Sequence, residues 1–130
     1  MAELRIEVPA DLVEAVHEPL MEMHEDTFES LRGRHVDEDD RRRWRRRLAA
    51  VDRLLGQIGL DDRRAEDSAW LIGEQDVLVD AVLSATSRWA ERLADVCVGM
   101  ENREECTLDE ATERYERLGG LLGLLRMCCL

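Results

Sequence analysis

Residues 78–96, LVDAVLSATSRWAERLADV, carry the clearest amphipathic pattern in the chain. Apolar side chains recur at every third or fourth position along one face, and polar side chains occupy the opposite face. Because an α-helix has about 3.6 residues per turn, this spacing predicts a long helix from about Glu74 to Val98. The apolar face consists of Leu78, Val82, Ala85, Trp89, Leu93 and Val96, and the polar face of Asp80, Ser84, Arg88, Glu91 and Asp95.

Three further segments, on both sides of this stretch, have helical patterns. The first is Pro9–Gly33, in which Pro19 predicts either one kinked helix or two short ones. The second is Asp37–Gly59, which opens with an acidic run at the positive end of the helix dipole. The last is Thr107–Cys129, which begins with a capping box and continues as a short heptad seam. Four helices with short connections predict an all-α antiparallel bundle, in which residues 1–130 form a single domain.

Two short segments outside these helices have their own patterns. Leu4, Ile6 and Val8 alternate with charged residues, which predicts a short extended segment at the N-terminus. Between the second and third helices, Ser68 is positioned to cap a short turn that holds residues 70–72 and stops at Gly73. We therefore expect no sheet beyond the N-terminal segment.

The composition argues against several classes of function. The chain has 130 residues, of which 45% are hydrophobic and 37% charged, and its formal net charge of −12 repels nucleic acid and anionic membrane surfaces. The longest apolar stretch, residues 118–125, is too short to cross a membrane, and residues 1–10 contain no apolar leader. Free thiols in a reducing cytoplasm are expected, since no paired metal-ligand spacing joins Cys97, Cys106, Cys128 and Cys129.

The run Arg41–Arg47 is the most conspicuous local feature, with six arginines around Trp44. One interpretation is an anion- or nucleic-acid-binding module that uses the Arg41–Arg53 face, with guanidinium groups on phosphates. The other is structural, because acidic residues four positions earlier can pair with the first arginines and Trp44 falls on the apolar stripe of its helix. The net charge favours the structural interpretation. The candidate basic patch is Arg42, Arg45, Arg46 and Arg53.

Metal binding is a further alternative, because Glu14 and His17 have the Glu-x-x-His spacing of carboxylate-bridged helical bundles. Glu18 and His24 are additional candidate ligands, but no second Glu-x-x-His pair follows, so a complete site needs a second chain. Neither cysteine that a histidine could activate, Cys97 or Cys106, has the flanking residues of a catalytic cysteine. No phosphate-binding loop or nucleophile elbow is present. We therefore expect a non-enzymatic protein without a cofactor.

The segment Leu118–Leu130 is apolar around nearly its whole circumference. A single bundle of this size has few surfaces to cover such a helix, and Gly119 and Gly123, one turn apart, permit close approach of another backbone. The pattern favours a subunit interface. The sequence thus predicts a protein–protein interaction module, a regulator, adaptor or small assembly protein that forms a homo-oligomer, most simply a dimer. The predicted interface residues are Tyr115, Leu118, Leu122 and Leu125.

Overall fold

The computed structural model describes residues 3–33, 37–58, 69–97 and 108–127. The elements, in chain order, are β1 (Glu3–Val8), α1 (Ala10–Leu31), α2 (Glu38–Ile58), β2 (Ala69–Glu74), α3 (Gln75–Cys97) and α4 (Leu108–Met127). The prediction of an all-α four-helix fold with an N-terminal extended segment is therefore confirmed. The capping residue Thr107, the linker at 59–68 and the histidine at position 35 lie outside the described residues.

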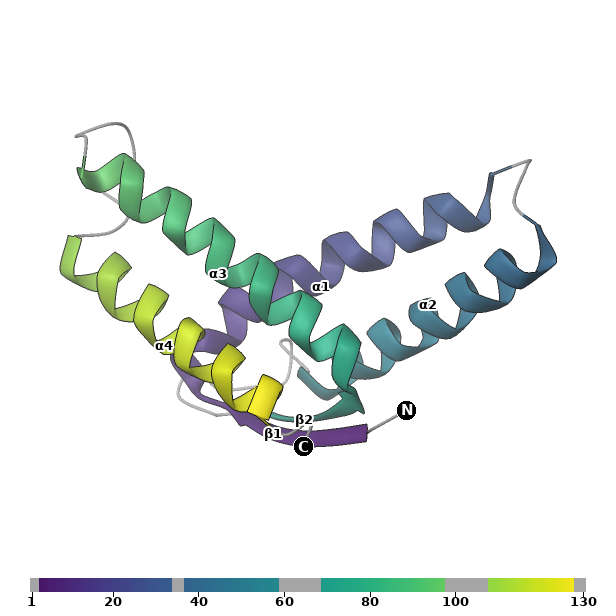
Figure 1. Ribbon diagram of the computed structural model, residues 1–130, viewed down its shortest axis with the longest axis horizontal. Helices are drawn as coiled ribbons and strands as arrows, with labels where there is room; N and C mark the ends of the chain where they lie inside the picture. Colours follow the sequence, from purple (N-terminus) through teal and green to yellow (C-terminus); the bar gives the residue numbers. More distant parts are fainter. Residues whose placement is uncertain (1–2, 34–36, 59–68, 98–107, 128–130) are drawn as a thin grey trace.

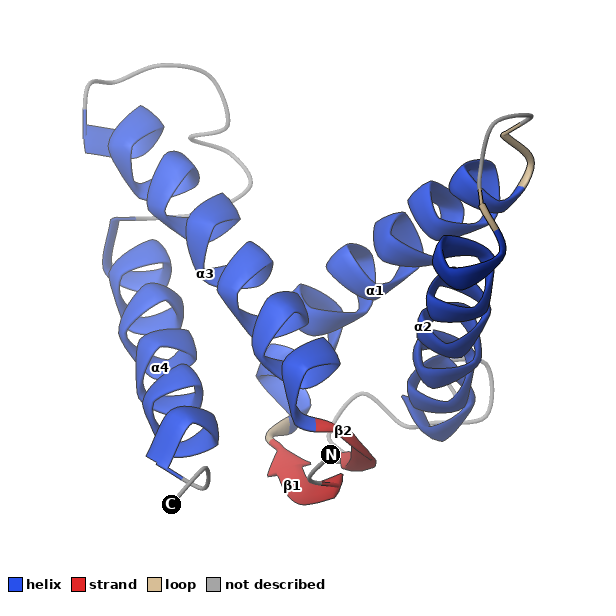
Figure 2. Ribbon diagram, turned by 45° about the vertical axis from the view of Figure 1, so that its right-hand side comes forward, coloured by secondary structure: helices blue, strands red, loops and turns tan. Residues whose placement is uncertain are grey.

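The four helices form two antiparallel hairpins that spread apart like the arms of a V (Figures 1 and 2). One arm is α1 with α2, and the other is α3 with α4. The arms meet where α1 packs against α3, and the small sheet lies at the vertex. In each hairpin, a helix therefore packs one side against the other helix of the pair and has another side open to solvent.

The segment predicted as a short turn after Ser68 is instead strand β2, so that prediction is wrong. β2 pairs antiparallel with β1, in a register that runs from Glu3 opposite Glu74 to Val8 opposite Ala69. Its side chains alternate, since Trp70 is half exposed while Leu71 is buried. The pattern is too short to identify a strand by itself, and its pairing partner lies more than sixty positions earlier in the sequence.

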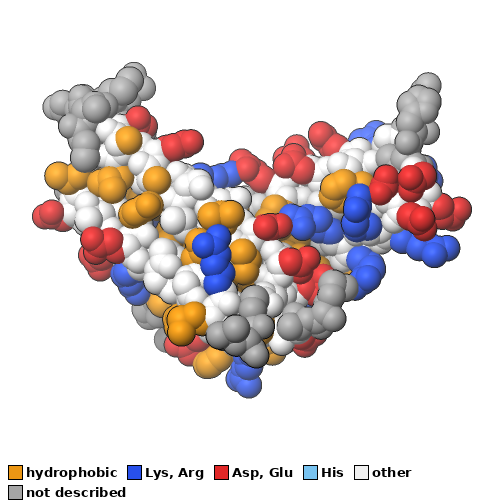
Figure 3. Space-filling view, viewed as in Figure 1, with side chains coloured by type: hydrophobic (Ala, Val, Ile, Leu, Met, Phe, Trp, Pro, Cys, Tyr) orange, Lys and Arg blue, Asp and Glu red, His pale blue; other side chains and the backbone are white. Residues whose placement is uncertain are grey.

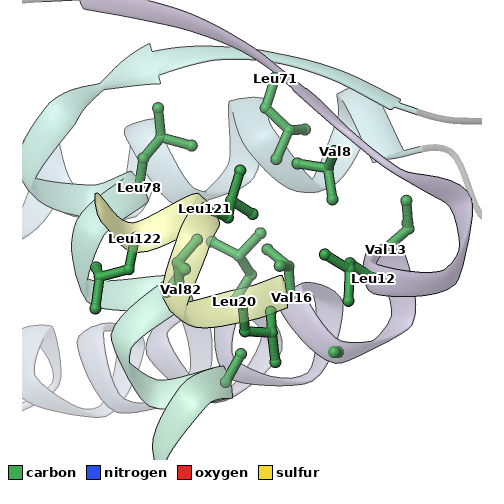
Figure 4. Close-up of a cluster of buried hydrophobic side chains, with 14 of the residues drawn as sticks. Val8, Leu12, Val13, Val16, Leu20, Leu71, Leu78, Val82, Leu121 and Leu122 are labelled. Atoms are coloured by element: carbon green, nitrogen blue, oxygen red, sulfur yellow. The ribbon is translucent and has the colours of Figure 1, made fainter. Parts of the chain in front are cut away.

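The core lies at the vertex, where the sheet and both hairpins contribute buried side chains (Figure 4). Helix α1 continues through Pro19, which is itself buried, so the single-helix alternative is the one observed. Trp89 is also part of the core, with 6% of its surface exposed. The residues labelled in Figure 4 are Val8, Leu12, Val13, Val16, Leu20, Leu71, Leu78, Val82, Leu121 and Leu122.

Helix α2 is anchored at both ends by polar contacts. At its start, the Asp37 carboxylate accepts a hydrogen bond of 2.9 Å from the Asp40 amide, which satisfies one of the free N–H groups of the first turn. At its end, the Gln57 side-chain amide binds both backbone groups of Ile72: Nε2 donates to the carbonyl at 3.0 Å, and Oε1 accepts from the N–H at 2.6 Å. Gln57 therefore completes the edge of β2 that β1 leaves free.

Candidate functional site

A hollow of about 340 Å³ opens at the junction of three helices. Glu14, His17 and Glu18 reach it from α1, Trp89 and Arg92 from α3, and Arg114 from α4. The α1 residues lie on consecutive turns because positions 14, 17 and 18 share one face of a helix. The hollow thus combines two carboxylates, two guanidinium groups, an imidazole and an indole ring.

The Trp89 ring is flanked by both guanidinium groups of the hollow. The Arg92 Cζ atom lies 4.7 Å from the ring centroid, and the Arg114 Cζ atom lies 5.0 Å from it. These distances are typical of cation–π contacts. Stacking on an aromatic ring covers the flat faces of a guanidinium group and leaves its in-plane N–H donors available. Trp89 therefore holds two sets of donors at the edge of the hollow.

The metal-site candidates are only partly brought together. Glu14, His17 and Glu18 line the same hollow, but Arg92 and Arg114 line it too, and their positive charge disfavours a cation there. His24 lies against α2, with its Nε2 atom 2.8 Å from an Asp52 carboxylate oxygen. Within the four described ranges, no group of three or more His, Cys, Asp or Glu side chains is arranged to hold a metal ion.

Two of the four basic-patch candidates pair with acidic residues from other elements. Arg53 donates hydrogen bonds of 3.0 and 3.3 Å to the two carboxylate oxygens of Glu3 on β1. Hydrogen bonding to Arg53 and its positive charge lower the pKa of Glu3 below its usual value. Arg46 lies 3.6 Å from Glu74. In the described part of the chain, Arg42 and Arg45 have no carboxylate within ion-pair distance, and both are exposed.

The predicted pairing within α2 differs from the one observed. Arg43 contacts Asp40, three residues earlier, at 2.7 Å, and Arg47 contacts Asp80 of α3 at 3.0 Å. Trp44 was expected in the core but is only half buried. It lines a hollow of about 710 Å³ between α2 and the start of α3, so solvent reaches part of its ring. Two arginines of the run, Arg46 and Arg47, thus contact acidic residues of other elements.

Three of the four predicted interface residues are covered within one chain, which corrects their assignment. Leu118, Leu122 and Leu125 have 0%, 8% and 1% of their surface exposed, because this side of α4 packs against α3 and the core. Tyr115 is 37% exposed. The argument that no single chain covers the whole segment holds only for the other side of the helix.

That other side, which we call the α4 outer face, combines exposed apolar side chains with glycines. Leu124 and Met127 are 58% and 68% exposed, more than most large apolar residues in the described chain. A β-carbon built on any glycine of α4 would have no neighbouring atom within 4 Å in the described part of the chain, apart from the backbone of α4 itself. Apolar side chains are prominent on the α3–α4 arm in Figure 3. The α4 outer face comprises Tyr115, Gly119, Gly120, Gly123, Leu124 and Met127.

Sequence reasoning missed Arg92 and Arg114, which belong to different helices and have no local motif. The one available signal is that Arg92 lies three positions after Trp89 on a predicted helix, whereas Arg114 is the one described residue of its helix that lines the hollow. The side chain of Cys97 and the other three cysteines lie outside what the structure describes, so the expectation of free thiols is not tested. None of the described helices is both long and apolar enough to cross a membrane.

Comparisons of the chain with protein-family models, with curated proteins and with solved structures find no match. The functional argument therefore rests on the geometry of the described residues.

Proposed function

We propose that this chain is a non-enzymatic protein–protein interaction module that self-associates, and that the α4 outer face carries the contact between copies. The observation that carries the proposal is the set of glycines on this face. Each glycine in a helix interior costs about 1 kcal/mol relative to alanine. Among the described residues, no atom beyond the helix backbone lies within 4 Å of the position that an alanine methyl group would occupy. A second helix that packs closely would use this space.

Exposed apolar surface on the same face supports the proposal. Tyr115, Leu124 and Met127 flank the glycines, with 37%, 58% and 68% of their surface exposed. Burying such side chains between two copies removes apolar area from water, at about 25 cal/mol per Å². Tyrosine is also suited to interfaces because its ring packs while its hydroxyl stays hydrated.

Charges on α4 favour an antiparallel arrangement of two copies. We consider two α4 helices that pair antiparallel about a two-fold axis at the level of Leu121. A residue that lies a given number of positions before Leu121 then faces the residue that lies the same number of positions after Leu121 in the second copy. Gly119 then meets Gly123 of the second copy, Tyr115 meets Met127, and Glu116 meets Arg126. Each of these contacts occurs twice, as a two-fold interface requires. The pairing brings opposite charges together and gives the helix dipoles opposite directions.

Substitutions on the α4 outer face test this proposal. Gly119→Leu fills the space between the helices, and Leu124→Glu places a charge in the contact, so each variant is expected to sediment as a monomer. Far-UV circular dichroism should remain helical, because both positions are exposed within one chain. Leu83→Glu is the matched control, since Leu83 is 41% exposed on α3, away from this face. Variants that keep the molar mass of the wild type would contradict the proposal.

A charge exchange makes the test specific to the antiparallel arrangement. Arg126→Glu places like charges opposite Glu116 and is expected to weaken the dimer. The double variant Arg126→Glu/Glu116→Arg restores opposite charges and is expected to recover the wild-type association. Equal weakening in the single and double variants would exclude this register.

A further inference from the structure

In the described part of the chain, three of the four Arg and Glu side chains that line the α1–α3–α4 hollow are not in ion pairs. Arg92 and Arg114 have no carboxylate within 4 Å, and Glu14 has no cation within that distance. The fourth, Glu18, contacts Arg88 of α3. The hollow thus offers charged groups of both signs to a ligand.

We propose that this hollow binds a small zwitterion, an α-amino acid. Arg92 and Arg114 offer planar sets of N–H donors, which match the two oxygens of a carboxylate. Both guanidinium groups already contact the Trp89 ring, which restricts their motion before a ligand arrives. Less side-chain freedom is then lost on binding.

The α1 side of the hollow supplies the complementary charge. Glu14 and Glu18 present carboxylates that accept hydrogen bonds from a ligand ammonium group, and His17 lies between them in sequence. Glu18 also contacts Arg88 at 3.4 Å, whereas Glu14 has no ion-pair partner in the described part of the chain. A simple anion would satisfy the arginines but would be repelled by Glu14, and a metal ion would be repelled by the arginines.

The size of the hollow is compatible with a ligand of this class. The hollow measures about 340 Å³ and lies within the range of ligand pockets, about 300–1,000 Å³. Its lining is mostly polar, and its two apolar residues, Ala15 and Trp89, are buried. This inference does not depend on self-association, because the α4 outer face and the hollow use different residues.

Fluorescence of Trp89 provides a direct test. Trp44→Phe/Trp70→Phe leaves Trp89 as the sole tryptophan, and both replaced residues lie outside the hollow. L-Leucine at millimolar concentration is expected to change the emission in a saturable manner. N-acetyl-L-leucine, which lacks the ammonium group, and L-leucinamide, which lacks the carboxylate, should both bind at least about tenfold more weakly. Absence of saturable leucine binding would overturn the proposal, as would equal binding of the acetylated compound.

Variants identify the residues that make the contact. In the same background, Arg114→Gln and Glu14→Gln are each expected to weaken leucine binding by about tenfold. Arg45→Gln and Glu113→Gln, which change charges outside the hollow, should leave it unchanged. If Arg114→Gln and Glu14→Gln bind leucine as well as these controls do, the ligand does not occupy this hollow.

Discussion

Gly73 lies against a buried side chain, whereas Gly119 lies on an exposed face of its helix. A β-carbon on Gly73 would lie 2.9 Å from Cδ2 of Leu54, a side chain with no exposed surface. Real β-carbons essentially never come that close, so Leu54 or the strand must shift. At Gly119, by contrast, the corresponding space is empty. Gly73 therefore permits close packing within one chain, whereas no described residue packs against Gly119 from outside its own helix.

Alanine substitution at these glycines should therefore change stability in opposite directions. Gly73→Ala is expected to lower the free energy of unfolding by about 1–3 kcal/mol through overpacking. Gly119→Ala should raise it by up to about 1 kcal/mol through helix propensity. Urea unfolding in the Leu124→Glu background, where the account predicts a monomer, measures both effects without a contribution from association. A destabilising effect of Gly119→Ala in that background would mean that another part of the chain fills this space.

The Glu3–Arg53 pair makes stability depend on pH in a defined direction. Because the folded-state pKa of Glu3 is lowered from 4.5, the pair stabilises the fold at pH values above 4.5. This contribution is lost as the pH falls through the folded-state pKa. Arg53→Gln should therefore reduce the free energy of unfolding slightly at neutral pH and have no effect once Glu3 is protonated in both states. A difference between wild type and variant that stays constant across this pH range would contradict the assignment.

At the scale of elements, the Gln57 side chain forms hydrogen bonds with the backbone of β2, as a neighbouring strand would. Gln57→Ala leaves the N–H and C=O of Ile72 without these partners and is expected to cost about 1–3 kcal/mol. Gln57→Glu keeps an acceptor for the N–H but loses the donor to the carbonyl. Its effect on the free energy of unfolding should therefore differ from that of Gln57→Ala. Amide hydrogen exchange at Ile72 reports the change locally, with faster exchange expected in the alanine variant. Unchanged exchange there would show that β2 does not depend on this side chain.

The helices could be predicted from the sequence because each has a local pattern that tertiary packing reinforces. The apolar face that includes Leu78, Val82 and Trp89 is buried as expected, and the alternation in residues 3–8 does form a strand. β2 was not predictable, because a segment of this length becomes a strand only through pairing with β1 and through Gln57. The hollow was not predictable as a whole for the same reason. The sequence pointed to its α1 residues at positions 14, 17 and 18, but the arginines opposite lie on two other helices. No local pattern in the sequence specifies where those helices pack.

The predicted interface shows a related limit of sequence reasoning. An apolar circumference indicates that a helix needs cover, but it does not say which side its own chain covers. The structure assigns Leu118, Leu122 and Leu125 to the core and leaves Leu124 and Met127 exposed. Leu122→Glu would therefore test folding, whereas Leu124→Glu tests association.

At the scale of the whole molecule, polar contacts between elements define how the two arms meet. Arg88 of α3 contacts Glu18 and Glu22 of α1, and Arg117 of α4 contacts Asp11 at the start of α1. These pairs join α1 to the α3–α4 arm (Figure 2), while Leu124 and Met127 of the α4 outer face are exposed. The V shape thus separates surfaces that build the fold from a surface that is open to a second copy.

Sedimentation equilibrium of the wild-type chain tests the central claim, self-association through α4, most directly. Over a concentration series that reaches tens of micromolar, the account predicts a molar mass that rises towards twice the 15.0 kDa of one chain. Leu124→Glu, measured alongside it, should remain at the mass of one chain. A wild type that stays at 15.0 kDa throughout the series would contradict the account.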